Sequence, residues 1–319
     1  MKNDVTAFGE ILIDFTDAGK DERNTPLFAA HPGGAPANVA VGVSRLGGTS
    51  AFIGKIGDDF HGEMLRQVLE DNQVDTTGLI TDDQAFTTLA FVKVDENGER
   101  TFSFARKPGA DTRISWEEME DEQIKNSRIF HVGSLSLTHE PAASATRNAL
   151  DLAKKEGTIV SYDPNYRASL WTDEATAIQA MRSLIPYADI MKISDEETNL
   201  LTDHQDPTEA AKALLDQGVT IAAVTLGADG SLVANQEGVR QVPGFASKVA
   251  DTNGAGDSFW AAMLTQIAKS EKRPEELTLD ELEDFVRYAN AAAALTVRKP
   301  GAIPAMPKHD EVVALLEKE

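Results

Sequence analysis

The sequence predicts one large α/β domain, built on a mostly parallel sheet with helices on both faces. Apolar, strand-like runs alternate along the chain with segments of helical periodicity, and this succession is typical of parallel β–α–β units. The chain has 319 residues, 41% of them hydrophobic, which is enough for a single extensive core. Several helical segments also end at glycine, the residue that most readily terminates a helix.

The N-terminal half supplies four of the expected elements. Residues 5–13 form a mostly apolar run and predict one buried strand. Residues 37–46 predict a helix with a single apolar stripe, ended by two glycines. A short strand over 50–53 and a helix over 63–70 follow. These elements begin the alternation expected of a parallel sheet.

The second half continues the same pattern. A helix over 142–155 stops at a glycine, and residues 158–162 predict the next strand. The pair Asp206-Pro207 combines an N-cap residue with proline at the first helical position, so a helix should begin there. That helix should stop at Gly218 and lead into a strand over 219–225.

One region departs from the alternation. Residues 87–94 and 100–105 flank an Asn-Gly turn within 95–98, which is a strong β-hairpin signal. Together with residues 14–30 this hairpin could form a small separate sheet, suited to a lid over a site at the strand carboxyl ends. A plain edge hairpin is the alternative, and the sequence does not choose between them.

Composition limits the classes of function. A net charge of −22 repels polyanions, so nucleic-acid binding is not expected. The absence of cysteine excludes disulfides, thiolate metal sites and a cysteine nucleophile. No apolar run has the length of a membrane span and no signal region opens the chain, which predicts a cytoplasmic protein without membrane partners.

Common catalytic motifs are absent. There is no Walker A loop, no His-Glu-x-x-His and no Gly-x-Ser-x-Gly elbow. The six histidines lack metal-ligand spacing, and His131, at the end of an apolar run, is expected to be a packed or hydrogen-bonded residue.

The segment Asp251-Thr-Asn-Gly-Ala-Gly-Asp257 is the most informative part of the chain, because it sets a glycine-rich turn directly before an apolar helix. Free N–H groups at a helix N-terminus attract anions, and Gly254 and Gly256 leave room for a phosphate. An acid beside an anion site, here Asp257, suits a base that takes a proton from an attacking hydroxyl. An ordinary capped turn explains the segment equally well when it is considered alone.

A second glycine-rich turn, Pro32-Gly-Gly-Ala-Pro-Ala-Asn38, also leads into a helix. Together the two turns resemble the two signatures of the ribokinase (PfkB) family of carbohydrate kinases, and the resemblance covers essentially the whole chain. Further segments resemble the fructokinase branch of that family: 9–15, 102–111, 131–137 and 163–167 followed by Leu170-Trp171. The resemblance implies a ribokinase-like three-layer α/β/α fold over 1–319, with a β lid formed by about 14–32 and 87–108.

The resemblance also implies roles for individual residues. Asp257 matches the catalytic base, and the backbone of Asn253, Gly254, Ala255 and Gly256 matches the anion hole. The sugar-binding positions correspond to Asp14, Gly33, Gly34 and Asn38. Arg106 and Arg167 match arginines that face substrate or phosphate. A surface ion pair is the alternative for both arginines in so acidic a chain.

Nucleotide and metal positions follow in the same way. Thr225, Gly227 and Gly230 resemble the nucleotide-binding loop, and Asn290 matches a position beside the adenine, with a merely buried polar residue as its alternative. Lys192-Ile-Ser194-Asp-Glu-Glu197 resembles an Asn-x-x-Glu motif with serine in place of asparagine. Glu197 is thus the candidate for organising Mg²⁺ through water, and Asp251 and Thr252 fall where some relatives hold K⁺.

The implied activity is transfer of the ATP γ-phosphate to D-fructose at O6. The closest rival is a kinase for another sugar, such as 2-keto-3-deoxygluconate or ribose. A keto-acid substrate needs a cation for its carboxylate, and Arg106 or Arg167 could supply it. A non-catalytic binding protein on this fold is a more remote rival, because both the base and the glycine-rich turn are present. Lid-mediated dimers occur among members of the family, so the resemblance also implies a homodimer through the lid as one possible assembly.

Overall fold

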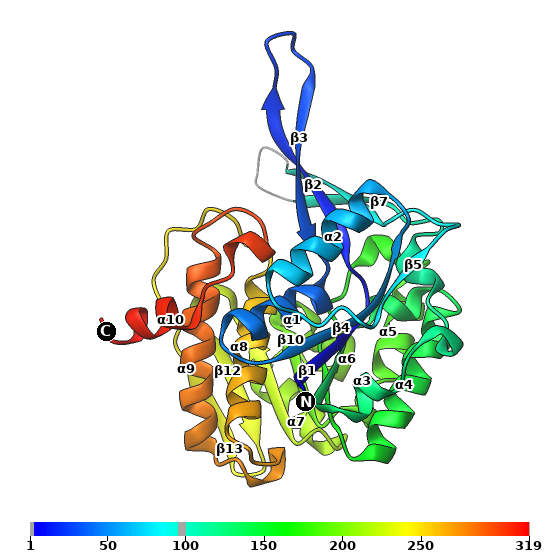
Figure 1. Cartoon of the computed structure of the whole chain (residues 1–319). Coiled ribbons are helices and arrows are strands. Elements are labelled where there is room, and N and C mark those ends of the chain that lie inside the picture. The colour runs from blue at the N-terminus through cyan, green and yellow to red at the C-terminus, as the bar shows by residue number, and fades with distance from the viewer. Residues whose placement is uncertain (1–2, 95–99, 319) are drawn as a thin grey trace.

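The computed structural model describes residues 3–94 and 100–318, which form two sheets and the helices around the larger one (Figure 1). The strands are β1 (Asn3–Phe8), β2 (Leu12–Lys20), β3 (Pro26–Gly33), β4 (Ser50–Gly57), β5 (Leu79–Asp82), β6 (Leu89–Val94), β7 (Arg100–Ala105), β8 (Ser127–Val132), β9 (Ile159–Tyr162), β10 (Ile190–Ser194), β11 (Ile221–Thr225), β12 (Ser231–Asn235) and β13 (Gly238–Val242). The helices are α1 (Ala35–Arg45), α2 (Phe60–Asp71), α3 (Glu122–Lys125), α4 (Ala142–Glu156), α5 (Glu174–Arg182), α6 (Thr198–Thr202), α7 (Pro207–Asp216), α8 (Ala255–Lys269), α9 (Leu279–Thr296) and α10 (His309–Leu316).

The larger sheet has nine strands in the order β13-β12-β11-β10-β9-β8-β1-β4-β5 within the described residues. Every pairing from β5 to β11 is parallel, and only β12 and β13 at one edge run antiparallel. The predicted mostly parallel sheet is therefore confirmed.

Helices cover both faces of this sheet, which gives three layers (Figure 1). Side chains alternate along the strands, so Ile221 and Ala223 of β11 join the core under α1, α8, α9 and α10. Ala222 and Val224 join the core under α4, α5, α6 and α7. A strand buried on both faces explains why residues 221–224 are apolar without interruption. None of the helices in the described part of the chain is long and apolar enough to span a bilayer.

Most predicted elements of the larger domain are confirmed, with shifted ends. The helix expected at Asp206-Pro207 is α7, and the Asp206 side chain accepts hydrogen bonds from the N–H groups of Thr208 and Glu209 at 2.9 and 3.0 Å. The strand predicted over 50–53 continues to Gly57 as β4.

The prediction of one strand over residues 5–13 is wrong. β1 ends at Phe8, Gly9 takes a positive φ of 151°, and the chain enters the other sheet as β2 at Leu12. Both halves are buried, so the sequence looks like one buried strand although the two halves belong to different sheets. This break places Glu10 between the two sheets.

The second sheet has the order β3-β2-β6-β7, with β2 parallel to β6 and the other pairs antiparallel. The predicted grouping of residues 14–30 with the hairpin strands is confirmed. The Asn-Gly turn at 95–98 lies outside the described residues. In Figure 1 the β2–β3 hairpin projects from the body of the molecule at the top of the view. Its action as a lid remains a prediction.

Candidate active site

The residues of the candidate site gather where parallel strands of the larger sheet end. Asp163 follows β9, Ser194 ends β10 and Thr225 ends β11, and the N-terminus of α8 lies among them as part of the same cavity wall. Ligands of open α/β sheets bind at this carboxyl edge.

Two cavities meet at this edge. The larger, of about 890 Å³, is lined by residues 165–169, Lys192, residues 194–197, Thr225, Gly227, residues 252–254, Gly256 and Asp257. The smaller, of about 50 Å³, is lined by Glu10, Leu12, Asp14, Gly34, Ala35, Asn38, Phe104, Leu135, Asn165, Arg167, Asn253 and Asp257. Asp257 and Asn253 belong to both walls, so a group bound in one cavity can meet a group bound in the other at Asp257.

Asp257 is a buried carboxyl in the first turn of α8. Its Oδ2 accepts a hydrogen bond from Nδ2 of Asn38, on α1, at 2.7 Å. Burial raises the pKa of the Asp257 carboxyl, while the Lys192 ammonium acts in the opposite direction. The Asp163 carboxylate adds to the rise. An acid held in this environment accepts a proton more readily than one in water, as a general base requires.

The turn before α8 exposes backbone donors to the larger cavity. Gly254 is the N-cap and takes the left-handed φ of 76°, where an added Cβ would lie 2.7 Å from the Cβ of Ala302. The N–H groups of Gly254 and Gly256 have no hydrogen-bond partner among the described residues, whereas that of Asn253 donates to Asp251 Oδ1 at 2.9 Å. Ala255 N–H makes only a long contact, 3.4 Å, with the carbonyl of Thr252. The free donors and the helix dipole make this turn suited to an anion.

The predicted sugar positions surround the smaller cavity. Asp14 on β2 and Asn38 on α1 line it, as does Gly34. Gly34 takes φ 105°, and an added Cβ would lie 2.5 Å from the carbonyl oxygen of Glu10. Gly33 packs against Asp14, whose pKa burial raises to about 6. The wall thus offers carboxylate acceptors and an amide in a small space, as a polyol needs.

Glu10 is a site residue that the sequence analysis did not single out. It is 3% exposed, and its Oε1 accepts a hydrogen bond from Ala35 N–H at 3.1 Å. Its Oε2, like Oδ1 of Asn38, is buried without a partner among the described residues. Burial raises the pKa of Glu10 to about 7. An acid inside an otherwise apolar run was the signal that could have found it.

A second group missed from sequence is Asp163. Lys192 Nζ pairs with Asp163 Oδ2 at 2.6 Å, and both side chains are at least nine-tenths buried. Burial lowers the pKa of Lys192, but the negative charges of Asp163, Glu197 and Asp257 have a larger effect in the opposite direction. The pKa of the lysine is therefore raised. Lys192 lines the larger cavity and lies close to Gly256, so it brings a fixed positive charge to the start of α8.

The two predicted arginines occupy different environments. Arg167 lines both cavities, and its Nη1 donates to the carbonyl of Tyr166 at 2.9 Å. Arg106 lines neither. Its guanidinium is buried and donates to Asp111, to the hydroxyl of Thr138 and to the Leu135 carbonyl. A buried guanidinium needs such partners. In this arrangement Arg106 connects the end of β7 to residues 135–138 and lies outside the walls of both cavities.

Only some of the residues predicted to contact the nucleotide line the larger cavity. Thr225 and Gly227 line the larger cavity, whereas Gly230 and Asn290 do not. Asn290 accepts from the Ser231 hydroxyl at 2.8 Å and donates to the carbonyls of Val242 and Pro243 at 3.1 and 3.2 Å. Its amide therefore ties α9 to the strands of the antiparallel edge, which corresponds to the alternative considered from sequence.

The residues of the site suit a metal ion that they contact through bound water. Among the described residues no group of three or more His, Asp or Glu could hold a metal. Glu197 Oε1 accepts from Tyr166 N–H at 2.7 Å, and Oε2 accepts from the N–H and hydroxyl of Ser194 at 2.8 and 3.1 Å. Each oxygen still has acceptor capacity for a metal-bound water. At the position considered for K⁺, the Asp251 carboxylate accepts from the N–H groups of Asn253 and Gly301.

Comparison with known proteins identifies the family. The model of the pfkB family carbohydrate kinases matches residues 2–309. The chain belongs to the pfkB family of carbohydrate kinases. Fructokinase-1 of Zea mays is 42% identical over 318 residues, which cover 98% of each chain.

Solved structures agree with this assignment. The fructokinase from Xylella fastidiosa with bound ATP superposes with a TM-score of 0.91 at 33% identity, covering 99% of each chain. The fructokinase from Vibrio cholerae O395, in its fructose, ADP and calcium ion bound form, has a TM-score of 0.88 at 35% identity, covering 98% of each chain. This pfkB kinase is accordingly an ATP-dependent sugar kinase with the ribokinase-like fold.

Proposed function

We propose that the protein transfers the γ-phosphate of ATP to fructose, at the O6 hydroxyl. The observation that carries the proposal is the position of Asp257 on the wall common to both cavities, beside the free N–H groups of the turn before α8. The fructokinase relatives supply the identity of the sugar, and the bound ATP, ADP and fructose in their structures support the same pair of substrates.

In the proposed reaction the sugar binds at the smaller cavity with its reacting hydroxyl inside it, and the triphosphate occupies the larger cavity. Asp257 accepts the proton of the O6 hydroxyl as that oxygen attacks the γ-phosphorus. The bond between the γ-phosphorus and the β–γ bridging oxygen breaks, and ADP leaves. The N–H groups of Gly254 and Gly256 donate to the transferred phosphoryl group, and Lys192 adds positive charge nearby. Asn38 holds the carboxylate of Asp257 toward the sugar side through its 2.7 Å hydrogen bond.

The smaller cavity supports a neutral, hydroxyl-rich substrate over a keto acid. Its lining contains the three carboxyl groups of Glu10, Asp14 and Asp257 against the single cation Arg167. Arg106, the second cation considered for a substrate carboxylate, is already paired with Asp111. A fructose hydroxyl can donate to the unpartnered acceptors of Glu10 and Asn38.

Mg²⁺ is the proposed metal, held chiefly by ATP oxygens and water, with Glu197 accepting from a bound water. When bound, the ion neutralises phosphate charge during transfer. K⁺ beside Asp251 and Thr252 is the proposed monovalent ion. Calcium and potassium ions are present in the Vibrio cholerae fructokinase structures, which supports cation sites of both kinds.

We propose that the second sheet acts as the lid and also as the contact between two copies in a homodimer. On one face it carries two exposed aromatic side chains, Phe28 and Phe91, which are 51% and 38% exposed. Phe91 stacks on Phe15 and meets Phe28 edge-on, so the patch is ordered and aromatic. Exposed patches of this kind commonly mark interfaces.

The activity is tested by coupled ADP release with fructose, ribose, tagatose, glucose and 2-keto-3-deoxygluconate as acceptors. We expect the highest kcat/KM with fructose and a requirement for Mg²⁺. Turnover with another of these sugars and none with fructose would overturn the proposed substrate while leaving the family assignment intact. Analysis of the product by phosphorus NMR shows whether O6 carries the phosphate.

A further inference from the structure

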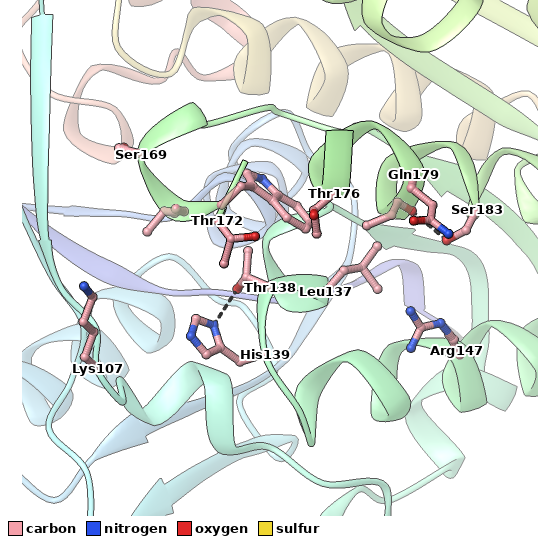
Figure 2. A pocket seen from close by; sticks show the side chains of 13 residues that line it. Lys107, Leu137, Thr138, His139, Arg147, Ser169, Thr172, Thr176, Gln179 and Ser183 are labelled. Atoms are coloured by element: carbon pink, nitrogen blue, oxygen red, sulfur yellow. Dashed lines mark hydrogen bonds between the residues drawn. The ribbon is translucent and has the colours of Figure 1, made fainter. Parts of the chain in front are cut away.

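A third cavity lies outside the site described above, between α4, α5 and the short helical turn Ala168–Leu170 (Figure 2). Its volume is about 570 Å³, within the range of small-molecule sites. Its wall consists of Lys107, residues 137–139, Arg147, residues 169–172, Thr176, Gln179, Ala180 and Ser183. Of these residues only Ser169 also lines the larger active-site cavity.

The charge of this cavity is opposite to that of the chain. Three lining residues are basic in type, Lys107, His139 and Arg147, and no acidic side chain lines the wall, although the protein carries 52 acidic residues against 30 Lys and Arg. Figure 2 shows Lys107 and Arg147 at opposite ends, with His139 between them. Within the described part of the chain, the one ion pair of Arg147 is a long contact of 3.7 Å with the exposed Glu140. The cavity therefore concentrates positive charge where the rest of the surface repels anions.

The positive charge around the cavity affects the pKa of His139. Burial lowers its pKa, and the nearby positive charges of Arg106 and Lys107 lower it further, so the ring stays neutral near pH 7. Its Nδ1 lies 3.1 Å from the hydroxyl oxygen of Thr138. A neutral imidazole can act as donor or acceptor for a ligand, while the lysine and the arginine provide the charge.

The remaining wall suits a sugar. Leu137, Leu170 and Trp171 give an apolar surface, and Thr172, Thr176 and Gln179 add hydroxyl and amide groups. Trp171 also keeps its indole N–H buried without a partner among the described residues, a donor that a ligand acceptor could satisfy. A bare inorganic anion would leave the apolar surface and most of these groups unused.

We propose that this cavity binds a small phosphorylated sugar, with the phosphate on Lys107 or Arg147 and the sugar ring on the Leu170–Trp171 surface. Ser169 lines both this cavity and the larger active-site cavity, and Arg167 precedes the helical turn that separates them. Thr138, on the opposite wall, accepts the Arg106 hydrogen bond at 2.8 Å. A ligand here contacts the segment that carries Arg167 and alters the KM for the acceptor sugar.

Equilibrium dialysis of the full chain against radiolabelled glucose 6-phosphate tests binding without depending on turnover. We expect saturable binding that excess unlabelled glucose 6-phosphate displaces. Arg147→Gln should raise Kd about tenfold or more, because it removes one charged contact with phosphate. Lys107→Gln should act in the same direction. Lys155→Gln removes an equal charge farther along α4, from an exposed lysine, and should leave Kd unchanged.

Absence of saturable binding would overturn the proposal. So would binding that Arg147→Gln and Lys107→Gln leave intact while Asp14→Asn, in the smaller active-site cavity, abolishes it, since the probe would then occupy the sugar site. Displacement by inorganic phosphate as effective as by glucose 6-phosphate would refute recognition of the sugar. Circular dichroism on each variant shows that the fold is retained.

Discussion

The chemistry of Asp257 depends on opposing influences on one carboxyl group. Burial and Asp163 favour its protonated form, while Lys192, Asn38 and Arg167 favour the carboxylate. Removing the carboxylate while keeping its shape isolates the role of the base. We expect Asp257→Asn to lower kcat by roughly 10²–10⁴ with little change in ATP affinity.

Steady-state kinetics and a separate ATP-binding titration check this expectation. Asp216→Asn provides the matched control, because Asp216 is exposed at the end of α7 and the substitution is the same. Near-normal turnover in the Asp257 variant would show that another group takes the proton.

Glu10 predicts a pH dependence of stability. Its pKa rises from 4.5 to about 7 on folding, because the carboxyl is buried and one oxygen lacks a partner. Between these values the folded state binds more protons than the unfolded state, so the free energy of unfolding falls as pH rises through this window. The loss should approach the order of 3 kcal/mol above pH 7.

Glu10→Gln keeps the shape and removes the titration. In urea unfolding at pH 5 and pH 8, we expect the wild type to lose more stability than the variant as pH rises. Equal changes in both proteins would assign the pH dependence to other groups. Activity of the variant should be assayed too, because Glu10 lines the proposed sugar cavity.

At the residue scale, site residues could be predicted from sequence where a local motif around them indicates their role. Asp257, Gly254 and Asn38 lie in two glycine-rich turns, and the structure brings these turns together from opposite ends of the chain. The Lys192–Asp163 pair and the burial of Arg106 depend on tertiary contacts, so single-sequence patterns carry little information about them.

At the scale of elements, the turn before α8 combines a phosphate-facing backbone with a tight contact to the loop after α9. Gly254 has a left-handed φ of 76° and an added Cβ would lie 2.7 Å from the Ala302 Cβ. Gly254→Ala should therefore cost about 1–3 kcal/mol of stability and also lower kcat, because the N–H groups of the turn would shift.

Gly157→Ala is the control that separates the stability cost of a left-handed backbone from the loss of kcat expected at the anion-binding turn. Gly157 has a similar φ of 71° at the end of α4, but its added Cβ would meet nothing within 4 Å. This control should lose about 1 kcal/mol and keep normal activity. Thermal unfolding and kcat of both variants make the comparison, and unchanged kcat in Gly254→Ala would argue against the anion-hole role.

Elements were predicted well where a helix cap or a glycine stop marks their ends, as at Asp206 and Gly218. They were predicted poorly where two buried strands follow each other. The run over residues 5–13 is apolar apart from Thr6 and Glu10 and is buried throughout, yet it crosses from one sheet to the other at Gly9. Hydrophobic pattern reports burial, and it does not report which sheet a strand joins.

At the scale of the whole molecule, the alternation of elements predicted the parallel sheet, whereas the direction in which the second sheet faces required the structure. That sheet presents Phe28 and Phe91 to solvent. A monomer gains nothing from exposing aromatic rings on a projecting hairpin, and pairing with a second copy would bury them. The homodimer prediction therefore places Phe28 in the interface.

Phe28→Glu should convert the dimer to a monomer, because two introduced carboxylates and two lost apolar contacts would face each other across the symmetric contact. Light scattering coupled to size-exclusion chromatography measures the mass directly. Val249→Glu is the control, since Val249 is 59% exposed and does not belong to a strand of the second sheet. A wild-type mass equal to one chain, 34.4 kDa, would refute the dimer. A dimer that persists in Phe28→Glu would assign the interface to another surface, because a carboxylate cannot remain buried opposite its own copy without a partner.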